Sequence, residues 1–383
     1  MHDFSIKEPV PSIVYYVSGH GFGHATRSAA IMNELHLERP EIPIHVRTWA
    51  SPEIFRQMCP ESSQSYCQFD LGVVQQDGIT MDIPKTLANA HRIFLQADIS
   101  VETELNFLQT LVPGCIISDI PPIAHRLANR LGVPSLTVTN FTWDWIYEDW
   151  SKDYPLAGHL AEKIHSDYCL SNCLLRLPYS GSFTLPTDCI DMPMLGRPAK
   201  IHRDEVRRRL GLASETRPLV LLSFGGMGLH SENAGSMEFP PEFCFVSTFP
   251  IQDNSIQILK SLGHYSIQYP DLVGAVDVVI TKPGYGIVSE CAVNQTRMLY
   301  TDRGPFREYN AILEELDQWN CAAFISRDRL LSGRFKEELE GLLSRDPRTV
   351  PRSEEAIAAK GAKVISSHIL NFYDKGETAF ECA

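Results

Sequence analysis

Residues 12–27, SIVYYVSGHGFGHATR, join an apolar run to a turn that holds three glycines and two histidines. The run is typical of a strand buried on both faces of a parallel sheet. The apolar residues that follow share one face of a predicted helix over 24–38. Where a glycine-rich turn links a strand to a helix, backbone N–H groups and the helix dipole favour an anion. Open α/β sheets bind ligands at this same edge. The opening therefore predicts a ligand site in an α/β fold.

The first half of the chain repeats this alternation of strand and helix. Helical patterns at 122–131 and 85–111 separate short apolar runs, whereas the rest of 60–113 shows no clear periodicity. Alternating strands and helices predict right-handed βαβ units in a doubly wound sheet. The expected strands of this half are 12–18, 43–49, 114–119, 134–140 and 173–178.

A polar, basic stretch marks the change to a second unit. We expect the linker near 196–202, followed by a short helix that ends at Gly211. Further strands are predicted to begin the stretches 218–228 and 276–286, both of which end in glycine-rich turns, and to occupy 296–302 and 321–326. A last helix, about 353–374, has no strand after it and must pack on existing structure, for which the N-terminal domain is one candidate. The predicted domains are 1–196 and 197–383.

Length and composition limit the classes of protein. With 383 residues the chain exceeds the roughly 250–300 at which a single core stops growing, so two domains are expected. A formal charge of −13 argues against nucleic acid as a partner. The ten cysteines are scattered without a CxxC pair, and no apolar run approaches the ~18 residues of a membrane span. We therefore expect a cytoplasmic protein without a transmembrane segment, while peripheral membrane contact stays open.

Five stretches together resemble a known family, the GT-B glycosyltransferases. They are GFGHATR (21–27), SDIPPIAHRLANRLGVPSLTVTN (118–140), LLSFGGMG (221–228), DVVITKPGYGIVSE (277–290) and PFREYNA (305–311). The likeness spans about 12–370. It points to the branch around the lipid-linked N-acetylglucosaminyltransferase of peptidoglycan synthesis. The opening is also similar to the glycosyltransferase-like N-terminal part of L-arabinokinase-type proteins. The resemblance implies two Rossmann-like domains that face each other across a cleft, the first binding the acceptor and the second a nucleotide-sugar.

The resemblance also implies donor-binding residues. Glu290 falls where the family places a carboxylate on the ribose hydroxyls, and a carboxylate that follows GIVS in an apolar stretch needs hydrogen-bond donors. Phe306 and Arg307 stand where the family often has an acidic–amide pair for the donor sugar, which leaves the sugar open. The expected donor-binding residues are Gly225, Gly226, Gly228, Lys282, Gly284, Tyr285, Gly286, Glu290, Arg307 and Glu308.

The catalytic residues implied by the resemblance lie in the first half. His24 matches the family's active-site histidine, and an imidazole is suited to accept a proton from a hydroxyl at neutral pH. Asp119 matches the acid that orients it, and His20 is the rival base. The expected acceptor-binding residues are Gly21, Gly23, Arg27, Asn140 and Trp143.

The activity that follows is transfer of a sugar from a nucleoside diphosphate sugar, with UDP first among the bases, to an acceptor hydroxyl. The enzyme would be of hexosyl- or N-acetylhexosaminyl-transferase type. The acceptor is a small molecule, a glycan or a lipid-linked sugar. No HExxH, clustered Cys/His set or DxD is present, so no bound metal is expected, and the nucleotide-sugar is a substrate rather than a cofactor. Two alternatives remain: a nucleotide-sugar hydrolase of the same fold, and a non-catalytic nucleotide-sugar-binding or regulatory protein.

Overall fold

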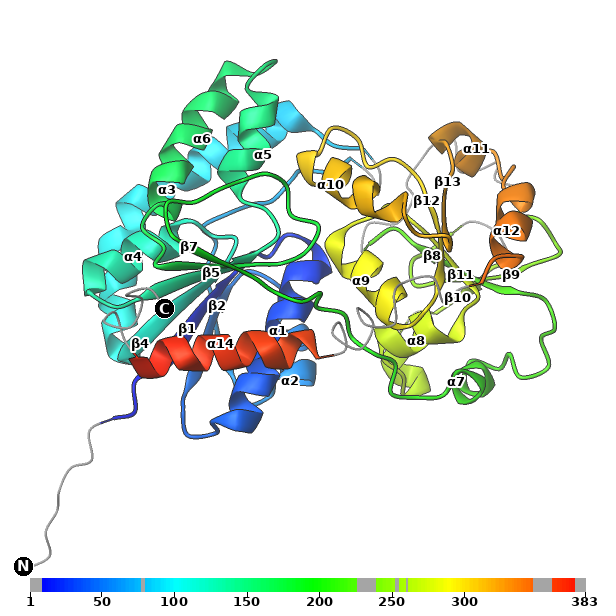
Figure 1. Ribbon diagram of the computed structural model, residues 1–383, viewed down its shortest axis with the longest axis horizontal. Coiled ribbons are helices and arrows are strands. Elements are labelled where there is room, and N and C mark those ends of the chain that lie inside the picture. Colours follow the sequence, from blue (N-terminus) through cyan, green and yellow to red (C-terminus); the bar gives the residue numbers. More distant parts are fainter. Residues whose placement is uncertain are drawn as a thin grey trace, which may run out of the picture.

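The computed structural model describes residues 9–76, 80–225, 239–251, 255–259, 261–346 and 360–375. Two parallel sheets, each flanked by helices, form two lobes (Figure 1). We call the part built on the first sheet the N-terminal lobe and the part built on the second the C-terminal lobe.

The N-terminal lobe holds a seven-stranded sheet in the order β3-β2-β1-β4-β5-β6-β7. Its strands are β1 (Ser12–Val17), β2 (Ile44–Thr48), β3 (Ser63–Tyr66), β4 (Pro113–Asp119), β5 (Ser135–Thr139), β6 (Cys173–Arg176) and β7 (Asp188–Asp191). Its helices are α1 (Gly21–Glu38), α2 (Pro52–Met58), α3 (Ile83–Leu111), α4 (Ile123–Leu131), α5 (Trp143–Trp150) and α6 (Pro155–Tyr168).

The C-terminal lobe holds a six-stranded sheet in the order β10-β9-β8-β11-β12-β13. Its strands are β8 (Leu219–Ser223), β9 (Cys244–Ser247), β10 (Gln257–Ile258), β11 (Val278–Thr281), β12 (Arg297–Tyr300) and β13 (Ala322–Phe324). Its helices are α7 (Arg203–Arg209), α8 (Tyr269–Ala275), α9 (Tyr285–Val293), α10 (Arg307–Leu316), α11 (Arg327–Leu331) and α12 (Lys336–Leu343), with a 3₁₀ turn at Leu262–Tyr265.

In each sheet the strands are added outward in one direction from the first strand, β1 or β8, and then in the other direction from the opposite side of that strand. This is the doubly wound arrangement that the sequence predicted. The central strands β1, β4 and β5 are buried along almost their whole length, as expected for strands with helices on both faces. Four strands are absent from the sequence-based prediction: β3, β7, β9 and β10. The edge strands β3 and β7 are polar and largely exposed, so they lack the apolar signature. β10 has only two residues, too few to show a pattern, whereas β9 is buried along its whole length and its apolar signal was overlooked.

The last described helix, α14 (Gly361–Lys375), returns to the N-terminal lobe. It packs against α1, and its residues Ile365, Ile369 and Phe372 are buried in a core shared with that helix. In Figure 1 it runs in red along the N-terminal lobe, far from α12, which precedes it among the described helices. The two lobes also meet directly, through α1 with α9 and through α5 with α10.

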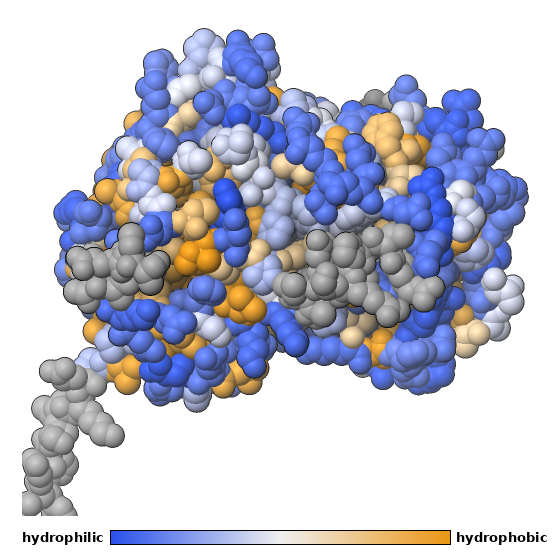
Figure 2. All heavy atoms as spheres, viewed as in Figure 1, coloured by the Kyte–Doolittle hydropathy of each residue, from blue (hydrophilic) through white to orange (hydrophobic). Residues whose placement is uncertain are grey.

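The face of the molecule seen in Figure 2 is mostly hydrophilic. On the face seen in Figure 2, hydrophobic side chains gather mainly over the N-terminal lobe, in patches broken by hydrophilic ones. Within the described residues, none of the helices combines the length and the apolar character that crossing a membrane requires.

Candidate active site

The switch point of the first sheet brings the two expected catalytic residues together. β1 and β4 are parallel neighbours, and Val17 near the end of β1 lies opposite Asp119 at the end of β4. The chain leaves β1 through Ser18–His20 and enters α1, whose first turn carries His24. Because the carboxyl ends of both strands lie at one edge of the sheet, residues 95 positions apart become neighbours.

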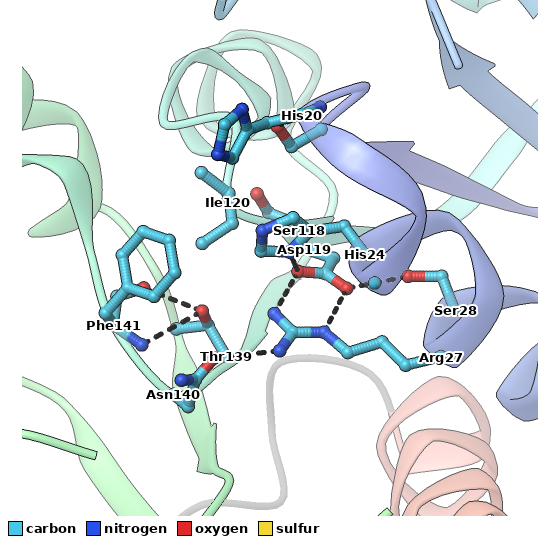
Figure 3. Close-up of polar contacts among 12 residues, drawn as sticks. His20, His24, Arg27, Ser28, Ser118, Asp119, Ile120, Thr139, Asn140 and Phe141 are labelled. Carbon is cyan, nitrogen blue, oxygen red and sulfur yellow. Dashed lines mark hydrogen bonds and ion pairs between the residues drawn. The ribbon is translucent and has the colours of Figure 1, made fainter. Parts of the chain in front are cut away.

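His24 and Asp119 are hydrogen-bonded. His24 Nδ1 lies 3.0 Å from Asp119 Oδ1, and both side chains are buried (Figure 3). A carboxylate accepts hydrogen bonds only, so in neutral His24 the proton sits on Nδ1 and Nε2 keeps its lone pair. This arrangement leaves Nε2 able to accept a proton from a second molecule.

Asp119 is shared among three donors. Arg27 binds it in a fork, with Nε 2.7 Å from Oδ2 and Nη2 2.5 Å from Oδ1, and Ser28 Oγ donates to Oδ2 at 2.8 Å. Burial alone would raise the pKa of Asp119, but Arg27 and His24 hold it well below its usual range. The carboxylate therefore stays ionised at any physiological pH.

His20 lies next to His24 on the same turn. Its ring meets the edge of Trp143, with 6.1 Å between ring centres, and lies 6.4 Å from the ring of His24. Burial and the nearby His24, Arg303 and Lys282 lower its pKa well below the ordinary value, which favours the neutral ring. Gly72, at φ 72°, allows the chain to pass this ring, because a Cβ there would fall 2.2 Å from His20.

One glycine-rich turn of the C-terminal lobe lies at the equivalent switch point. β8 and β11 are parallel neighbours; β11 runs into this turn, and after β8 the described chain continues only to Gly225. Gly225, after β8, is exposed with φ 74°. The other two glycines expected to hold the donor, Gly226 and Gly228, lie outside the described residues.

The turn after β11 faces the N-terminal lobe. Lys282 follows β11 directly, Gly284 precedes α9, and Tyr285 and Gly286 form the start of that helix. A Cβ on Gly286 would lie 3.6 Å from the Cα of Gly23 in α1. The amino-terminal ends of α9 and α1 therefore meet at the boundary between the lobes.

Glu290 is buried on α9 and has a donor from within the chain. Arg197 binds its Oε1, with the Arg197 Nε at 2.6 Å. Burial raises the pKa of Glu290, and Arg197 opposes that shift. The need for donors that the sequence indicated is thus met in part by Arg197, in the segment between the lobes.

The PFREYNA stretch packs against the N-terminal lobe. Phe306 is buried, edge-on to Phe141 and Trp143. Arg307 donates to the Trp145 carbonyl oxygen at 2.9 Å and lies over the Trp145 ring. In this arrangement both positions of the acidic–amide pair contact α5 or the loop before it.

Glu308 turns towards the site. Its carboxylate binds Arg303 and accepts a hydrogen bond of 2.7 Å from Asn140 Nδ2. Arg303 also lies against the turn after β11, since a Cβ on Gly284 would be 3.5 Å from Arg303 Nη1.

The five residues expected to bind the acceptor differ in exposure. Gly21 is exposed, with φ 68°, and Gly23 is partly buried. Arg27, Asn140 and Trp143 are buried: Arg27 and Asn140 bind each other, and the Trp143 indole donates to Asp70 at 3.2 Å.

Four residues near the site were not singled out from the sequence: Ser28, Asp70, Arg197 and Arg303. Asp70 is a buried carboxylate that accepts from two indoles, those of Trp49 and Trp143. One signal in the sequence pointed to Arg303: it follows the carboxyl end of β12, the edge of the sheet at which ligands bind. Among the residues the structure describes, no three His, Cys, Asp or Glu side chains are grouped to hold a metal ion.

Two parallel doubly wound sheets whose carboxyl edges meet at one boundary define the class of protein: the chain has the GT-B fold, as predicted. The calicheamicin glycosyltransferase CalG4 superposes with a TM-score of 0.63 at 14% identity, over 95% of this chain and 99% of that one. UGT2 of Phytolacca americana, in complex with UDP-2-fluoro-glucose and pterostilbene, superposes with a TM-score of 0.62 at 12% identity, over 96% and 100%.

A relative in sequence is L-arabinokinase of Arabidopsis thaliana. The two are 32% identical over 350 residues, which are 87% of this chain and 32% of the relative. The chain thus spans about a third of the length of the curated relative it matches. No family model matches the chain.

Proposed function

We propose that this protein binds a nucleoside diphosphate sugar between its lobes and transfers the sugar to an acceptor hydroxyl. The observation that carries this proposal is the position of the His24–Asp119 pair. It lies at the switch point of one sheet, and the first turn of α1, which carries His24, contacts the glycine-rich turn at the switch point of the other. Open α/β sheets bind ligands at that edge, and here two such edges meet.

The donor would lie on the C-terminal lobe. The N–H groups at the start of α9 and the charge of Lys282 suit the diphosphate, and Glu290 suits the ribose hydroxyls. UDP is the first candidate for the nucleotide, on the sequence resemblance and because Phytolacca americana UGT2 binds a UDP-sugar. In transfer, these groups would stabilise the charge that develops on the departing diphosphate, without a metal.

His24 would act as the general base. Its Nε2 takes the proton of the acceptor hydroxyl while that oxygen attacks the anomeric carbon and the bond to the diphosphate breaks. Asp119 fixes the tautomer and stabilises the imidazolium that forms. The same geometry would activate water, so a nucleotide-sugar hydrolase is the first alternative.

A second candidate is a protein that binds a nucleotide-sugar without catalysis. The observation that favours it is the use of Phe306 and Arg307, at the acidic–amide positions, for packing against the N-terminal lobe. The phosphorylation that the name L-arabinokinase indicates is not carried over, because the chain matches only 32% of that protein.

A ligand panel tests the proposal. We expect UDP or a UDP-sugar to raise the melting temperature more than GDP, dTDP or ADP do. A ligand at a hundredfold excess over Kd adds about 2.7 kcal/mol to the free energy of unfolding, so the nucleotide that binds most tightly gives the largest shift. The stabilising UDP-sugar is then incubated with and without candidate acceptors, and the products are separated. Free sugar without acceptor identifies the hydrolase, and tight binding with neither product identifies the non-catalytic protein. Stabilisation by none of the nucleotides or sugars contradicts the proposal.

Glu290→Gln is expected to weaken UDP binding about tenfold or more, because hydrogen bonds to charged groups contribute roughly 1.5–3 kcal/mol. The effect on 2′-deoxy-UDP should be much smaller, since that nucleotide lacks one of the two hydroxyls. Isothermal titration with both nucleotides measures the difference. Arg197→Gln is the matched variant: it removes the cationic internal donor and leaves the Glu290 carboxylate in place. Equal losses for the ribo- and deoxyribonucleotide in Glu290→Gln would assign Glu290 to the fold.

A further inference from the structure

A chain of buried polar side chains crosses the boundary between the lobes next to the candidate active site. Arg27 belongs to α1, Asn140 follows β5, Glu308 lies in the first turn of α10, and Arg303 precedes that helix. All four are at least nine-tenths buried. We call these four residues the interlobe bridge.

The bridge is continuous with the His24–Asp119 pair. Arg27 donates from Nε and Nη2 to Asp119 and from Nη1 to Asn140 Oδ1 at 2.8 Å. Asn140 Nδ2 in turn donates to Glu308, whose other oxygen binds Arg303. Figure 3 shows the half of this chain that runs from Asp119 through Arg27 to Asn140.

The far end of the bridge reaches the donor turn. Arg303 lies against Gly284, and its Nε is a buried donor without a hydrogen-bond partner among the described residues. The bridge therefore links the residue that orients the candidate base to the turn expected to hold the diphosphate. The lobes that carry these two groups are joined elsewhere by contacts that do not reach Asp119, such as Trp150 Nε1 donating to the Pro305 carbonyl oxygen.

Asn140 occupies the one place in the bridge that requires an amide. Its oxygen must accept from the cation Arg27, and its nitrogen must donate to the anion Glu308. An aspartate would accept from Arg27 but would face Glu308 as a second anion, and a leucine would leave both partners with buried, unpaired groups. The bridge and Asp119 together are neutral, because the carboxylates of Asp119 and Glu308 balance the cations Arg27 and Arg303.

We propose that Asn140 and Glu308 are positioning residues: through Arg27 they fix the Asp119 carboxylate, and with it the His24 ring, relative to the donor turn of the other lobe. This inference rests on the proposed function for its effect on catalysis. The hydrogen-bonded link between the lobes does not depend on the proposed function, because the protein contains it without a ligand.

A polarity swap tests the link without any ligand. Each single variant breaks the bridge. In Asn140→Asp, two acceptors face each other, the new aspartate and Glu308. In Glu308→Gln, two donors face each other, either the new glutamine amide and Arg303 or the new glutamine amide and Asn140. In the double variant the new glutamine donates to the new aspartate and accepts from Arg303, so the bridge re-forms with its direction reversed. Amide exchange of residues 18–28 should speed up about tenfold or more in each single variant and return towards the wild-type rate in the double variant. For Glu308→Gln this means that a change in the C-terminal lobe loosens the segment carrying His24 in the other.

Kinetics test the positioning role. The single variants should lower kcat about tenfold to hundredfold, with the Kd of UDP within about threefold of wild type, and the double variant should recover most of kcat. Trp150→Phe is the matched control: it removes another hydrogen bond between the lobes, and the amide exchange of residues 18–28 and kcat should change little.

The outcomes separate the two proposals. Exchange at 18–28 that is unchanged in both single variants, or equally raised by Trp150→Phe, overturns the inference. Raised exchange with an unchanged kcat reduces the bridge to a contact between lobes and overturns the positioning role. A wild-type protein that transfers no sugar, while the exchange rates follow the swap, refutes the proposed transferase and leaves the bridge standing.

Discussion

Replacing His24 with alanine is expected to lower the rate of sugar transfer about 10²–10⁴-fold, the usual contribution of a general base. The affinity for UDP should stay nearly intact, because His24 lies on α1 in the N-terminal lobe and the nucleotide is assigned to the other. Initial rates at saturating donor measure the first effect, and isothermal titration with UDP measures the second.

Two further histidine variants serve as a control and as a test of the rival base. His159 is exposed on α6 and takes part in none of the contacts that build the site, and His159→Ala should leave the rate unchanged. His20→Ala should cost less than His24→Ala, since of these two histidines it is His24 whose Nδ1 is hydrogen-bonded to a carboxylate in the described part of the chain. If His20→Ala abolishes transfer and His24→Ala is mild, the base is His20.

Asp119→Asn is expected to destabilise the fold by about 3–5 kcal/mol, as well as to slow transfer by a smaller factor than His24→Ala does. The substitution keeps the shape of the side chain but leaves the buried Arg27 without its counter-charge. Four of the five tryptophans lie in the N-terminal lobe, so their fluorescence during urea denaturation reports on that lobe. Asp98→Asn is the control: its carboxylate pairs with Arg126 and Lys163 near the surface and should cost about 1 kcal/mol or less.

The cost of Asp119→Asn should depend on pH. The pKa of Asp119 is lower in the folded protein than in the unfolded chain, where it is about 3.9. The stability it contributes is complete above the unfolded value and is lost as the pH falls towards the folded one. The difference in stability between wild type and variant should therefore shrink below about pH 4. A difference that is the same at pH 7 and pH 3 would contradict the ion pair.

Local signals explain why the sheet centres and the His24–Asp119 pair were predictable. β1 and β4 are largely apolar, and strand order in a doubly wound sheet places their carboxyl ends side by side. The polar edge strands β3 and β7 carry no such pattern, because their side chains are largely exposed.

The hydrogen-bond partners of the buried polar side chains could not be predicted from local signals. Arg197 and Glu290 are 93 residues apart, and Asn140 and Glu308 are 168 apart. Both pairings depend on how one lobe, or the segment between lobes, docks on the other. The sequence indicated that Glu290 needs donors, but the choice between a ribose and Arg197 is made by that docking, which no local pattern encodes.

The return of α14 to the first lobe has a consequence for synthesis. The chain emerges from the ribosome in order, so the residues of the first sheet and of α1 are complete long before Ile365, Ile369 and Phe372 exist. Until then, the face of α1 that these side chains cover is open to solvent and to chaperones. The nascent first lobe can close its core only after the whole second lobe has been made, so a stalled or truncated product would carry an unfinished hydrophobic face.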